Sequence, residues 1–199
     1  IACGLDKVKS ARELYRWNKP RYSSVVSAWC PNSLVGGAGY IRIASAGESN
    51  TIAEEFAEKH CPVYIGFGSM TAGKSADELA QMSVRALMES NNYGIVCSGW
   101  SEMILDAKTT PREVVKYARE RVLFVNWVDH RRIFEFCKVI VHHGGAGTTH
   151  IALESGTPQV ILPVIIDQFM WQSVTTRLKV GASAGQSLPE TTAKKLAKA

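Results

Sequence analysis

From about residue 45 onward, short apolar runs alternate with segments whose apolar residues recur near helical spacing. The apolar runs are rich in β-branched residues and lack strict alternation with polar positions, which is typical of strands covered on both faces. We predict strands over residues 62–67, 94–99, 121–127, 138–143 and 159–164. Because strands that alternate with helices indicate parallel pairing, the pattern predicts an α/β fold.

The clearest helix covers residues 75–90, where Leu79, Met82 and Leu87 recur near helical spacing and Asp77 and Glu78 stand near the start. Negative charge is favoured there by the helix dipole. Further helices are predicted over residues 111–118, 131–137, 146–155 and 167–179. Gly181 is expected to end the last of these. The fold class is therefore a Rossmann-like, doubly wound parallel sheet.

Residues 1–44 do not share this rhythm, because they mix proline, serine and glycine with one strand-like run. We interpret them as the remnant of another domain with a linker, and residues 45–199 as the α/β domain. The chain starts at Ile1 and stops in a helical pattern without a cap, which suggests a piece of a longer protein.

The 199 residues are 46% apolar, enough to bury a sizeable core. A net charge of +5 gives a mild bias towards anionic partners. Without a stripe of basic and aromatic residues, it does not favour nucleic acid. Basic residues gather between Lys7 and Arg21. They form either a solvated face or a contact with an anionic membrane surface.

The five cysteines are scattered, and they form no C-x-x-C pair. This argues against a zinc site and a disulfide framework and fits a reducing compartment. The chain contains no run long enough to span a bilayer, and no secretory signal opens it. We therefore expect a cytoplasmic protein, with peripheral membrane contact as an option.

A glycine-rich stretch follows the predicted strand 138–143, at the edge where open parallel sheets bind ligands. Gly144, Gly145 and Gly147 let backbone amides approach an anion, and the helix that begins near residue 146 points its positive end there. Thr148 and His143 can add donors. The stretch predicts a phosphate site, with a tight turn lacking any ligand as the alternative, since the usual dinucleotide and P-loop fingerprints do not occur.

Other candidates also follow predicted strands. Trp127 is either a core residue or a flat surface for a nucleobase. Asp167 and Gln168 either begin a helix or bind sugar hydroxyls. His142 points away from its neighbour His143 if the strand continues, so it packs or orients. The histidines of the glycine stretch have no carboxylate or thiolate at ligand spacing, so no metal site is predicted.

Together, the stretches PVYIGFGSM, NWVDHRRIF and VHHGGAGTTHIALESGTPQVILPVIIDQFMWQSVTTRLKVGA resemble the C-terminal, donor-binding domain of the GT-B glycosyltransferases of family 1. The similarity covers residues 62–181 and is closest to sterol glucosyltransferases and bacterial antibiotic glucosyltransferases. It implies a UDP-sugar as the donor substrate. Trp127 would stack on uracil, the Val128 backbone would bond to the base edge, and Asp167 with Gln168 would hold the sugar. The residues implied around the diphosphate are Ser69, His143, Gly145, Ala146, Gly147 and Thr148.

The resemblance further implies an inverting reaction that needs no metal or other cofactor. A hexose, with glucose as the first choice, would pass to a hydroxyl of a lipid or sterol-like acceptor. The acceptor and the general base would belong to an N-terminal domain, of which residues 1–44 would be the remnant. The catalytic residue is therefore unknown here, and this chain alone is expected to be inactive. The alternative is a non-catalytic UDP-sugar-binding module, or a subunit that requires a separate acceptor-binding chain.

Two positions depart from the family pattern. Ile151 stands where plant members carry a glutamate that binds ribose, and Asp129 replaces the proline of a frequent WVPH sequence.

Overall fold

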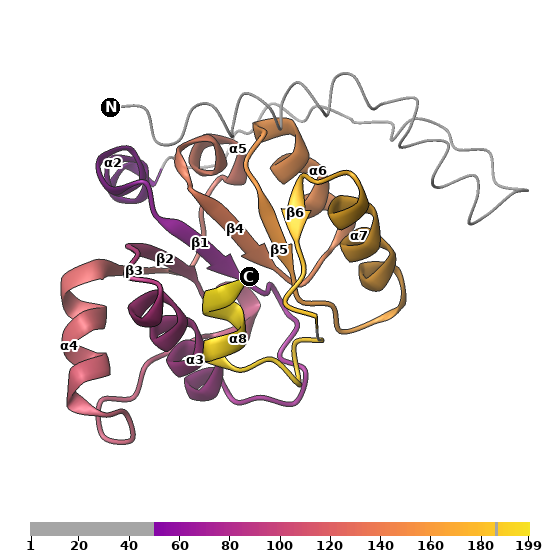
Figure 1. The fold of residues 1–199 in the computed structure, drawn as a ribbon. Coiled ribbons are helices and arrows are strands. Elements are labelled where there is room, and N and C mark those ends of the chain that lie inside the picture. The colour runs from indigo at the N-terminus through magenta and orange to yellow at the C-terminus, as the bar shows by residue number, and fades with distance from the viewer. Residues whose placement is uncertain (1–49, 186) are drawn as a thin grey trace, which may run out of the picture.

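The computed structural model describes residues 50–185 and 187–199 (Figure 1). The predicted remnant and linker at 1–44, the boundary at residue 45 and the basic segment between Lys7 and Arg21 lie outside these residues.

The described residues form one sheet of six parallel strands in the order β3-β2-β1-β4-β5-β6. The strands are β1 (Val63–Gly66), β2 (Gly94–Cys97), β3 (Val122–Val125), β4 (Val139–His142), β5 (Gln159–Ile161) and β6 (Gly181–Ala182). Continuous parallel register joins β1 to both β2 and β4. The predicted doubly wound parallel sheet is thus confirmed, with β6 as an additional edge strand.

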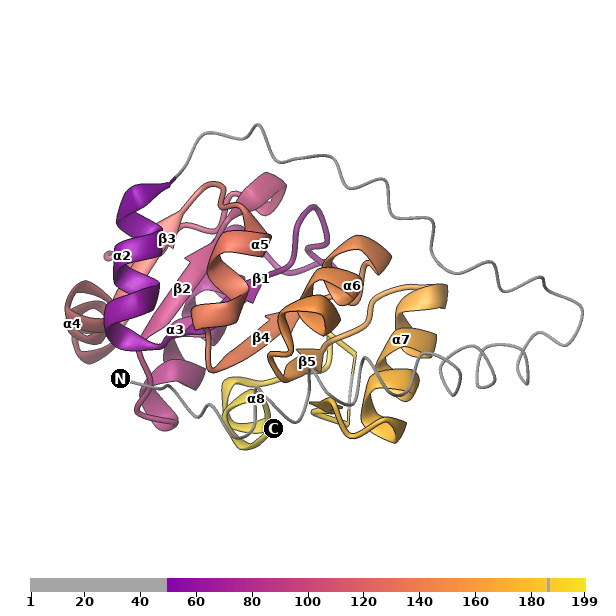
Figure 2. The same ribbon diagram turned by 90° about the horizontal axis from the view of Figure 1, so that it is seen from above.

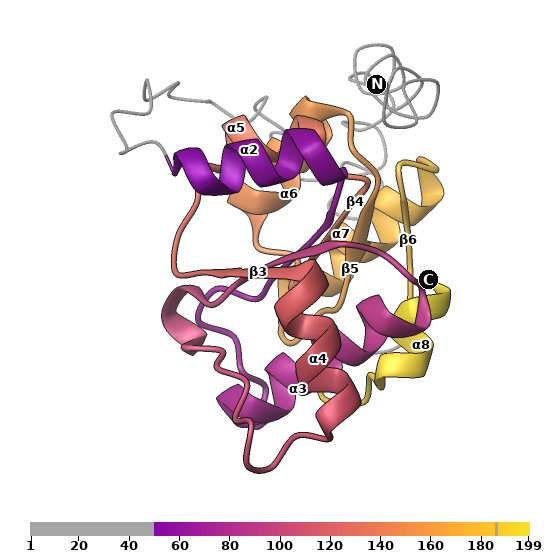
Figure 3. The same ribbon diagram turned by 90° about the vertical axis from the view of Figure 1, so that its left-hand side faces the viewer.

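Helices cover both faces of the sheet (Figures 1 and 3). One face carries α3 (Ala76–Glu89), α4 (Arg112–Arg121) and α8 (Ala193–Lys198). The other carries α2 (Thr51–His60), α5 (His130–Ile133) and α6 (Ala146–Ser155), with α7 (Ile166–Arg177) beside β5 and β6. Short 3-10 turns follow β2 and α5, at Gly99–Ser101 and Phe134–Phe136.

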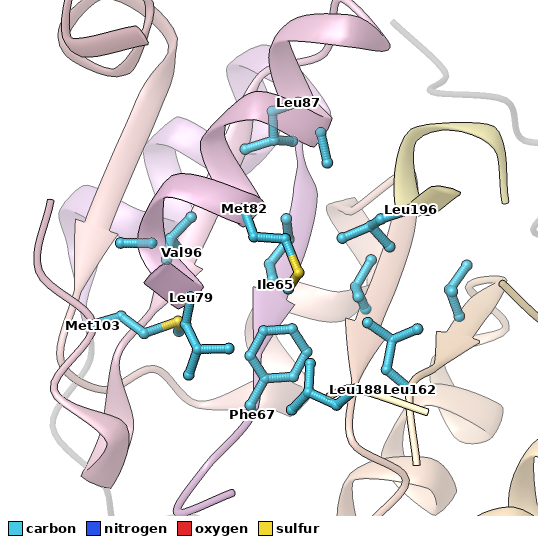
Figure 4. Close-up of a cluster of buried hydrophobic side chains, with 14 residues drawn as sticks. Ile65, Phe67, Leu79, Met82, Leu87, Val96, Met103, Leu162, Leu188 and Leu196 are labelled. Carbon is cyan, nitrogen blue, oxygen red and sulfur yellow. The ribbon is translucent and has the colours of Figure 1, made fainter. Parts of the chain in front are cut away.

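Two hydrophobic clusters fill the space between sheet and helices. In the first, Phe67 after β1 and Leu162 after β5 meet Leu79 of α3 and Leu196 of α8 (Figure 4). In the second, Tyr64 of β1 and Ile140 of β4 face α2, α5 and α6. Successive strand residues therefore feed opposite faces, which explains why the strands show no polar alternation.

Several element boundaries differ from the sequence prediction. Gly181 does not end a helix but lies in β6, where a Cβ would come within 2.4 Å of the Gln159 carbonyl oxygen, so the glycine permits close strand pairing. The left-handed residue after α7 is Lys179, with φ of 57°. Arg121 ends α4 rather than starting β3, and the helix α2 was not predicted.

Cys97 and Cys137 are free and buried, whereas Cys61 is disulfide-bonded. The expectation of uniformly reduced cysteines is therefore wrong at Cys61. Among the described residues, no helix is both long enough and apolar enough to cross a membrane.

Candidate functional site

The candidate site lies where the strand order reverses. β1 and β4 are neighbours in the sheet, and the strands continue outward from them in opposite directions. The chain leaves β1 towards α3 on one face and leaves β4 towards α6 on the other (Figure 1). The two loops therefore diverge at the carboxyl ends of their strands, which is the usual ligand position in open α/β sheets.

Two glycines shape the β4–α6 loop, residues 143–145. Gly144 has φ of 94°, and a Cβ on it would lie 2.7 Å from Cγ2 of Ile161 and 3.1 Å from Cβ of Gln168. A Cβ on Gly145 would lie 2.7 Å from Nε2 of His143. Only residues without a side chain therefore let the loop pass between β5, the start of α7 and the His143 imidazole.

The N-terminus of α6 faces this edge without a side-chain cap. Its N-cap is Gly145, which offers no side-chain oxygen, and the carbonyl of Gly145 already accepts from the backbone and hydroxyl of Thr149. The first-turn amides, including those of Ala146, Gly147 and Thr148, have no acceptor within the helix. Ala146 and Gly147 are exposed. The amides and the dipole together provide an environment suited to an anion.

His143 stands next to these amides with a nitrogen that has no protein partner. Its Nδ1 is buried and makes no hydrogen bond within the described part of the chain. The ring lies near the β1 loop, since a Cβ on Gly68 would be 3.4 Å from its Cε1. Burial lowers the pKa of His143, and the carboxylate of Asp167 opposes this effect. An unpaired buried nitrogen typically costs about 1–3 kcal/mol, which a ligand can recover.

His142 has a different environment, fully buried beneath the loop. Its Nε2 lies 2.8 Å from Oε1 of Gln159, and the Gly144 amide donates to its Nδ1 over 3.1 Å. The accepting Nδ1 makes Nε2 the protonated nitrogen, so Nε2 donates to Gln159. Burial lowers the pKa of His142 to about 3. His142 therefore orients the loop as a neutral imidazole, in agreement with the expectation that it packs or orients.

The β3–α5 loop, residues 126–129, carries Trp127 at the same edge, two strands away from β1. The Trp127 side chain is 52% exposed, which disfavours the alternative of a core residue. Val128 is buried in the second cluster. Asp129 begins α5, where its Oδ1 accepts from the Arg131 amide over 3.0 Å. The departure from proline at this position thus supplies a helix cap.

His130, the first residue of α5, connects the end of the β3–α5 loop to strand β1. Its Nε2 lies 2.9 Å from the hydroxyl of Tyr64 on β1, and its ring stacks on Phe134. Burial lowers the pKa of His130 to about 4, against the opposing effect of Asp129. Each of the two loops therefore sits next to one neutral histidine, fully buried in the case of His142 and half-buried in the case of His130.

The remaining predicted residues also lie at this edge, Ser69 in the loop after β1 and Asp167 and Gln168 in the first turn of α7, which follows β5. Ser69 and Asp167 are exposed. Gln168 is buried, and its Oε1 accepts from the amides of Val164 and Ile165 over 2.7 and 3.1 Å. Its carbonyl oxygen is therefore occupied by the start of its own helix. Only the amide NH2 of Gln168 can serve a ligand, which narrows the prediction that this side chain holds sugar hydroxyls.

The structure brings four strand ends to one edge, and close contacts among the described residues link part of the predicted site. His143 approaches Gly68 and Asp167, and Gly144 meets Gln168. Ile151, at the ribose position of plant members, packs against the second cluster instead. The ligand-binding roles of the candidate residues stay predictions.

Sequence reasoning missed Asn50 and, apart from Trp127, a set of exposed apolar residues. Asn50 was not singled out, yet its Nδ2 donates to the Trp127 carbonyl over 3.2 Å. Six of the seven large apolar side chains exposed among the described residues follow β2, β3 or β5. They are Trp100, Ile104, Trp127, Ile165, Ile166 and Phe169. No local pattern marks these residues as exposed.

The described residues contain no group of three or more histidine, cysteine, aspartate or glutamate side chains that could hold a metal ion. The expectation of a metal-independent site stays a prediction.

Comparisons with known proteins place the chain among glycosyltransferases. The model of a family described as erythromycin biosynthesis protein CIII-like, C-terminal domain, matches residues 95–199. An uncharacterized glycosyltransferase of Mycobacterium tuberculosis is 33% identical over 174 residues, 87% of this chain and 39% of that protein. A sterol 3-beta-glucosyltransferase of Arabidopsis thaliana is 31% identical over 170 residues, 85% of this chain and 25% of that protein.

A solved structure of UDP-glucose: anthocyanidin 3-O-glucosyltransferase in complex with UDP shares the fold, with a TM-score of 0.60 and 18% identity. The match covers 77% of this chain and 34% of that one. The chain thus spans well under half of the length of the proteins it matches.

Proposed function

Since the chain belongs to the family of erythromycin biosynthesis protein CIII-like C-terminal domains and is related to sterol glucosyltransferases, we propose that it is the donor-binding half of an inverting UDP-glycosyltransferase. The resemblance to GT-B glycosyltransferases is confirmed by these relatives and by the fold. The proposed reaction moves a hexose, with glucose as the first choice, from the UDP-sugar to a hydroxyl of a lipid or sterol-like acceptor. No metal takes part in it.

The observation that carries the proposal is the combination of His143 with the N-terminus of α6. A buried Nδ1 that bonds to none of the described residues and a set of helix amides without a side-chain cap lie together at the switch point of the sheet. Both are suited to a diphosphate, because oxygen anions accept from amides and from imidazole N–H groups. A loop that served only as a tight turn would have no need to leave a buried imidazole nitrogen unpaired.

In the reaction, the acceptor oxygen attacks the anomeric carbon and forms the new glycosidic bond. The bond from that carbon to the β-phosphate oxygen breaks, and its electron pair stays on UDP. Donors already in place at the leaving diphosphate lower the barrier, since they need no rearrangement as charge develops. Here these donors are the first-turn amides of α6 and the imidazole of His143, which do the work often given to a metal ion.

The proton of the acceptor hydroxyl needs a base, and the histidines of this chain are occupied elsewhere. The chain has five histidines in all. His60 stacks on Tyr93, His130 and His142 are bonded as described above, and Nδ1 of His150 lies 2.8 Å from the Ala146 carbonyl oxygen. His143 is assigned to the phosphates. We therefore place the base in the acceptor-binding domain.

The other ends of the donor fit the β3–α5 loop and the start of α7. The exposed indole of Trp127 offers a flat surface to uracil, and stacking of this kind tolerates any base. The backbone of Val128 is proposed to select the base edge. Asp167 accepts from sugar hydroxyls, while Gln168 donates through the NH2 group that its own helix leaves free.

The exposed apolar residues indicate a second binding surface at this edge of the sheet. Ile166 is 91% exposed and stands next to Asp167, and Trp100 is 88% exposed after β2. Clustered apolar exposure typically marks an interaction site. We assign this surface to the acceptor and the domain that binds it. Peripheral contact of the whole protein with a membrane stays part of the proposal for a lipid acceptor.

The second candidate is a UDP-sugar-binding module without catalysis, or a subunit that needs a separate acceptor-binding chain. The engagement of the other four histidines favours it for this chain in isolation. The chain alone should transfer no sugar to a sterol in either case. The assay that separates the two candidates therefore uses a longer protein that includes the acceptor-binding domain. Transfer by the longer parent protein supports the enzyme, and its absence supports the module.

Calorimetric titration with UDP and UDP-glucose tests the donor site directly. We expect binding of both ligands in EDTA, with no gain on addition of magnesium. No heat with either ligand would contradict the proposed function, and binding that required magnesium would contradict its metal-independent form.

A further inference from the structure

Asn50, the N-cap of helix α2, links this helix to the β3–α5 loop. The helix lies against α5 and β3, with Ala53 and Ala57 buried in the second cluster (Figure 2). Asn50, its N-cap, uses both ends of its amide. Oδ1 accepts from the Ala53 amide over 3.2 Å, and Nδ2 donates to the Trp127 carbonyl oxygen over 3.2 Å. One side chain therefore joins the start of α2 to the residue that carries the exposed indole.

A second, weaker link runs through Arg132 of α5. Its Nη1 lies 3.5 Å from Oε1 of Glu54 on α2, and its Nε lies 3.8 Å from Oδ2 of Asp129. Arg132 is about half exposed, and exposed ion pairs add little stability. This link holds α5 near α2 but does not touch Trp127. Asn50, at the N-cap of α2, is the residue that donates a hydrogen bond to the tryptophan backbone.

The indole itself has little to hold it in place. More than half of the Trp127 side chain is exposed, so packing fixes its plane only on one side. The orientation of the adjoining peptide then restricts which face the ring presents, because the rotamers that a side chain can adopt depend on the backbone φ and ψ. A hydrogen bond to the Trp127 carbonyl restrains that peptide.

We infer that Asn50 is a positioning residue, which holds the Trp127 peptide and through it the surface on which the donor base stacks. The inference rests on the proposed function, because it concerns the base end of the same site. Asn50 does not touch the donor.

The chemistry of the amide offers a clean test. Aspartate and serine cap helices about as well as asparagine, because each places an oxygen near the same amide. Aspartate has no donor in place of the NH2 group that bonds to the Trp127 carbonyl, and the serine hydroxyl ends one bond closer to the backbone, short of that group's position. Asn50→Asp and Asn50→Ser should therefore keep α2 and the melting temperature while losing the link. Comparing the two variants separates loss of the donor from the added charge of aspartate.

The experiment is a calorimetric or competition titration of the chain with UDP and with uridine. We expect both variants to bind each ligand about fivefold more weakly, the usual effect of one lost hydrogen bond. Equal loss for both ligands would locate the effect at the base end. Ser75→Ala is the control, since Ser75 caps α3 on the opposite face of the sheet. It should lower stability and leave UDP affinity unchanged.

Unchanged affinity in both Asn50 variants would overturn the inference while leaving the proposed function intact. Loss for UDP without loss for uridine would also overturn it, because the effect would then lie at the diphosphate. If the unaltered chain bound neither ligand, the proposed function itself would fail.

Discussion

The β4–α6 loop and the β3–α5 loop lie at the same edge of the sheet but are built in different ways. The first presents backbone amides and the unpaired His143, and it is shaped by Gly144 and Gly145. The second presents one half-exposed side chain, Trp127, whose backbone is held by Asn50 from 77 positions away. What the two loops share is a supporting imidazole that desolvation keeps neutral, from His142 and from the half-buried His130.

The comparison shows that one end of a site can depend on residues nearby in the sequence while the other end depends on residues far away in the sequence. A surface made of backbone amides depends on glycines in the same loop, so the sequence of that loop determines it. A surface made of one exposed ring needs restraint from elsewhere in the fold. The β4–α6 loop should therefore respond most to changes within itself, and the β3–α5 loop to changes in its neighbours.

Lowering the pH should reduce the unfolding free energy through both supporting histidines, His142 and His130, and this is the largest effect that we expect. An unfolded histidine titrates near 6.5, whereas the folded-state pKa is about 3 for His142 and about 4 for His130. The unfolded state therefore binds more protons in this range, so stability is complete above pH 6.5 and falls as the pH drops. At pH 5 each imidazole should cost about 2 kcal/mol of unfolding free energy. Urea titrations at pH 7 and pH 5 measure the loss.

Replacement of either supporting histidine sharpens this prediction. His142→Gln or His130→Gln should flatten the dependence of unfolding free energy on pH by about 1.4 kcal/mol per pH unit, the slope of one proton. Equal slopes in the variants and the unaltered chain would mean that these imidazoles do not titrate on unfolding.

Two glycines of the β4–α6 stretch should respond to alanine with opposite signs. Gly144→Ala combines a left-handed φ of 94° with a Cβ only 2.7 Å from Ile161, and should lower the unfolding free energy by about 3 kcal/mol. Gly147→Ala meets no atom within 4 Å in the first turn of α6 and should raise it by up to about 1 kcal/mol. Denaturant unfolding of both variants is the measurement, and similar values for the two would refute the account of this loop.

Two tryptophans at the same edge provide the smallest and most specific contrast. Trp127→Ala should weaken UDP and uridine alike by about tenfold, since stacking on an aromatic ring is worth about 1–3 kcal/mol per base. Trp100→Ala removes a ring that is 88% exposed and lies outside the proposed donor site, so UDP affinity should stay the same. Titration of both variants decides the matter, and a larger loss for Trp100→Ala would move the base site to the β2 loop.

The sequence predicted the fold well where apolar periodicity was strong. Five strands and the helix that contains Leu79 and Leu87 appear close to their expected positions. Helix α2 was missed because it buries only Ala53 and Ala57, and small side chains give a weak periodic signal. Gly181 was misread because a glycine that permits close strand pairing looks the same in sequence as one that ends a helix.

The candidate site shows the same division. The glycine stretch and its histidines could be read locally, and the resemblance to glycosyltransferases gave each residue a predicted role. The bond from Asn50 to Trp127 and the occupied oxygen of Gln168 could not be read, because both depend on how distant or neighbouring backbone is placed. Exposure of Ile166 and Trp100 is likewise a property of the folded chain.

The central claim is that His143, together with the α6 amides, holds the diphosphate of the donor. The most direct test is the ratio of UDP to uridine affinity in the unaltered chain and in His143→Ala. Because a hydrogen bond to a charged group is worth about 1.5–3 kcal/mol, the account predicts that His143→Ala lowers UDP affinity about 10- to 100-fold and leaves uridine affinity unchanged. An equal loss for both ligands, or no loss for UDP, would contradict it.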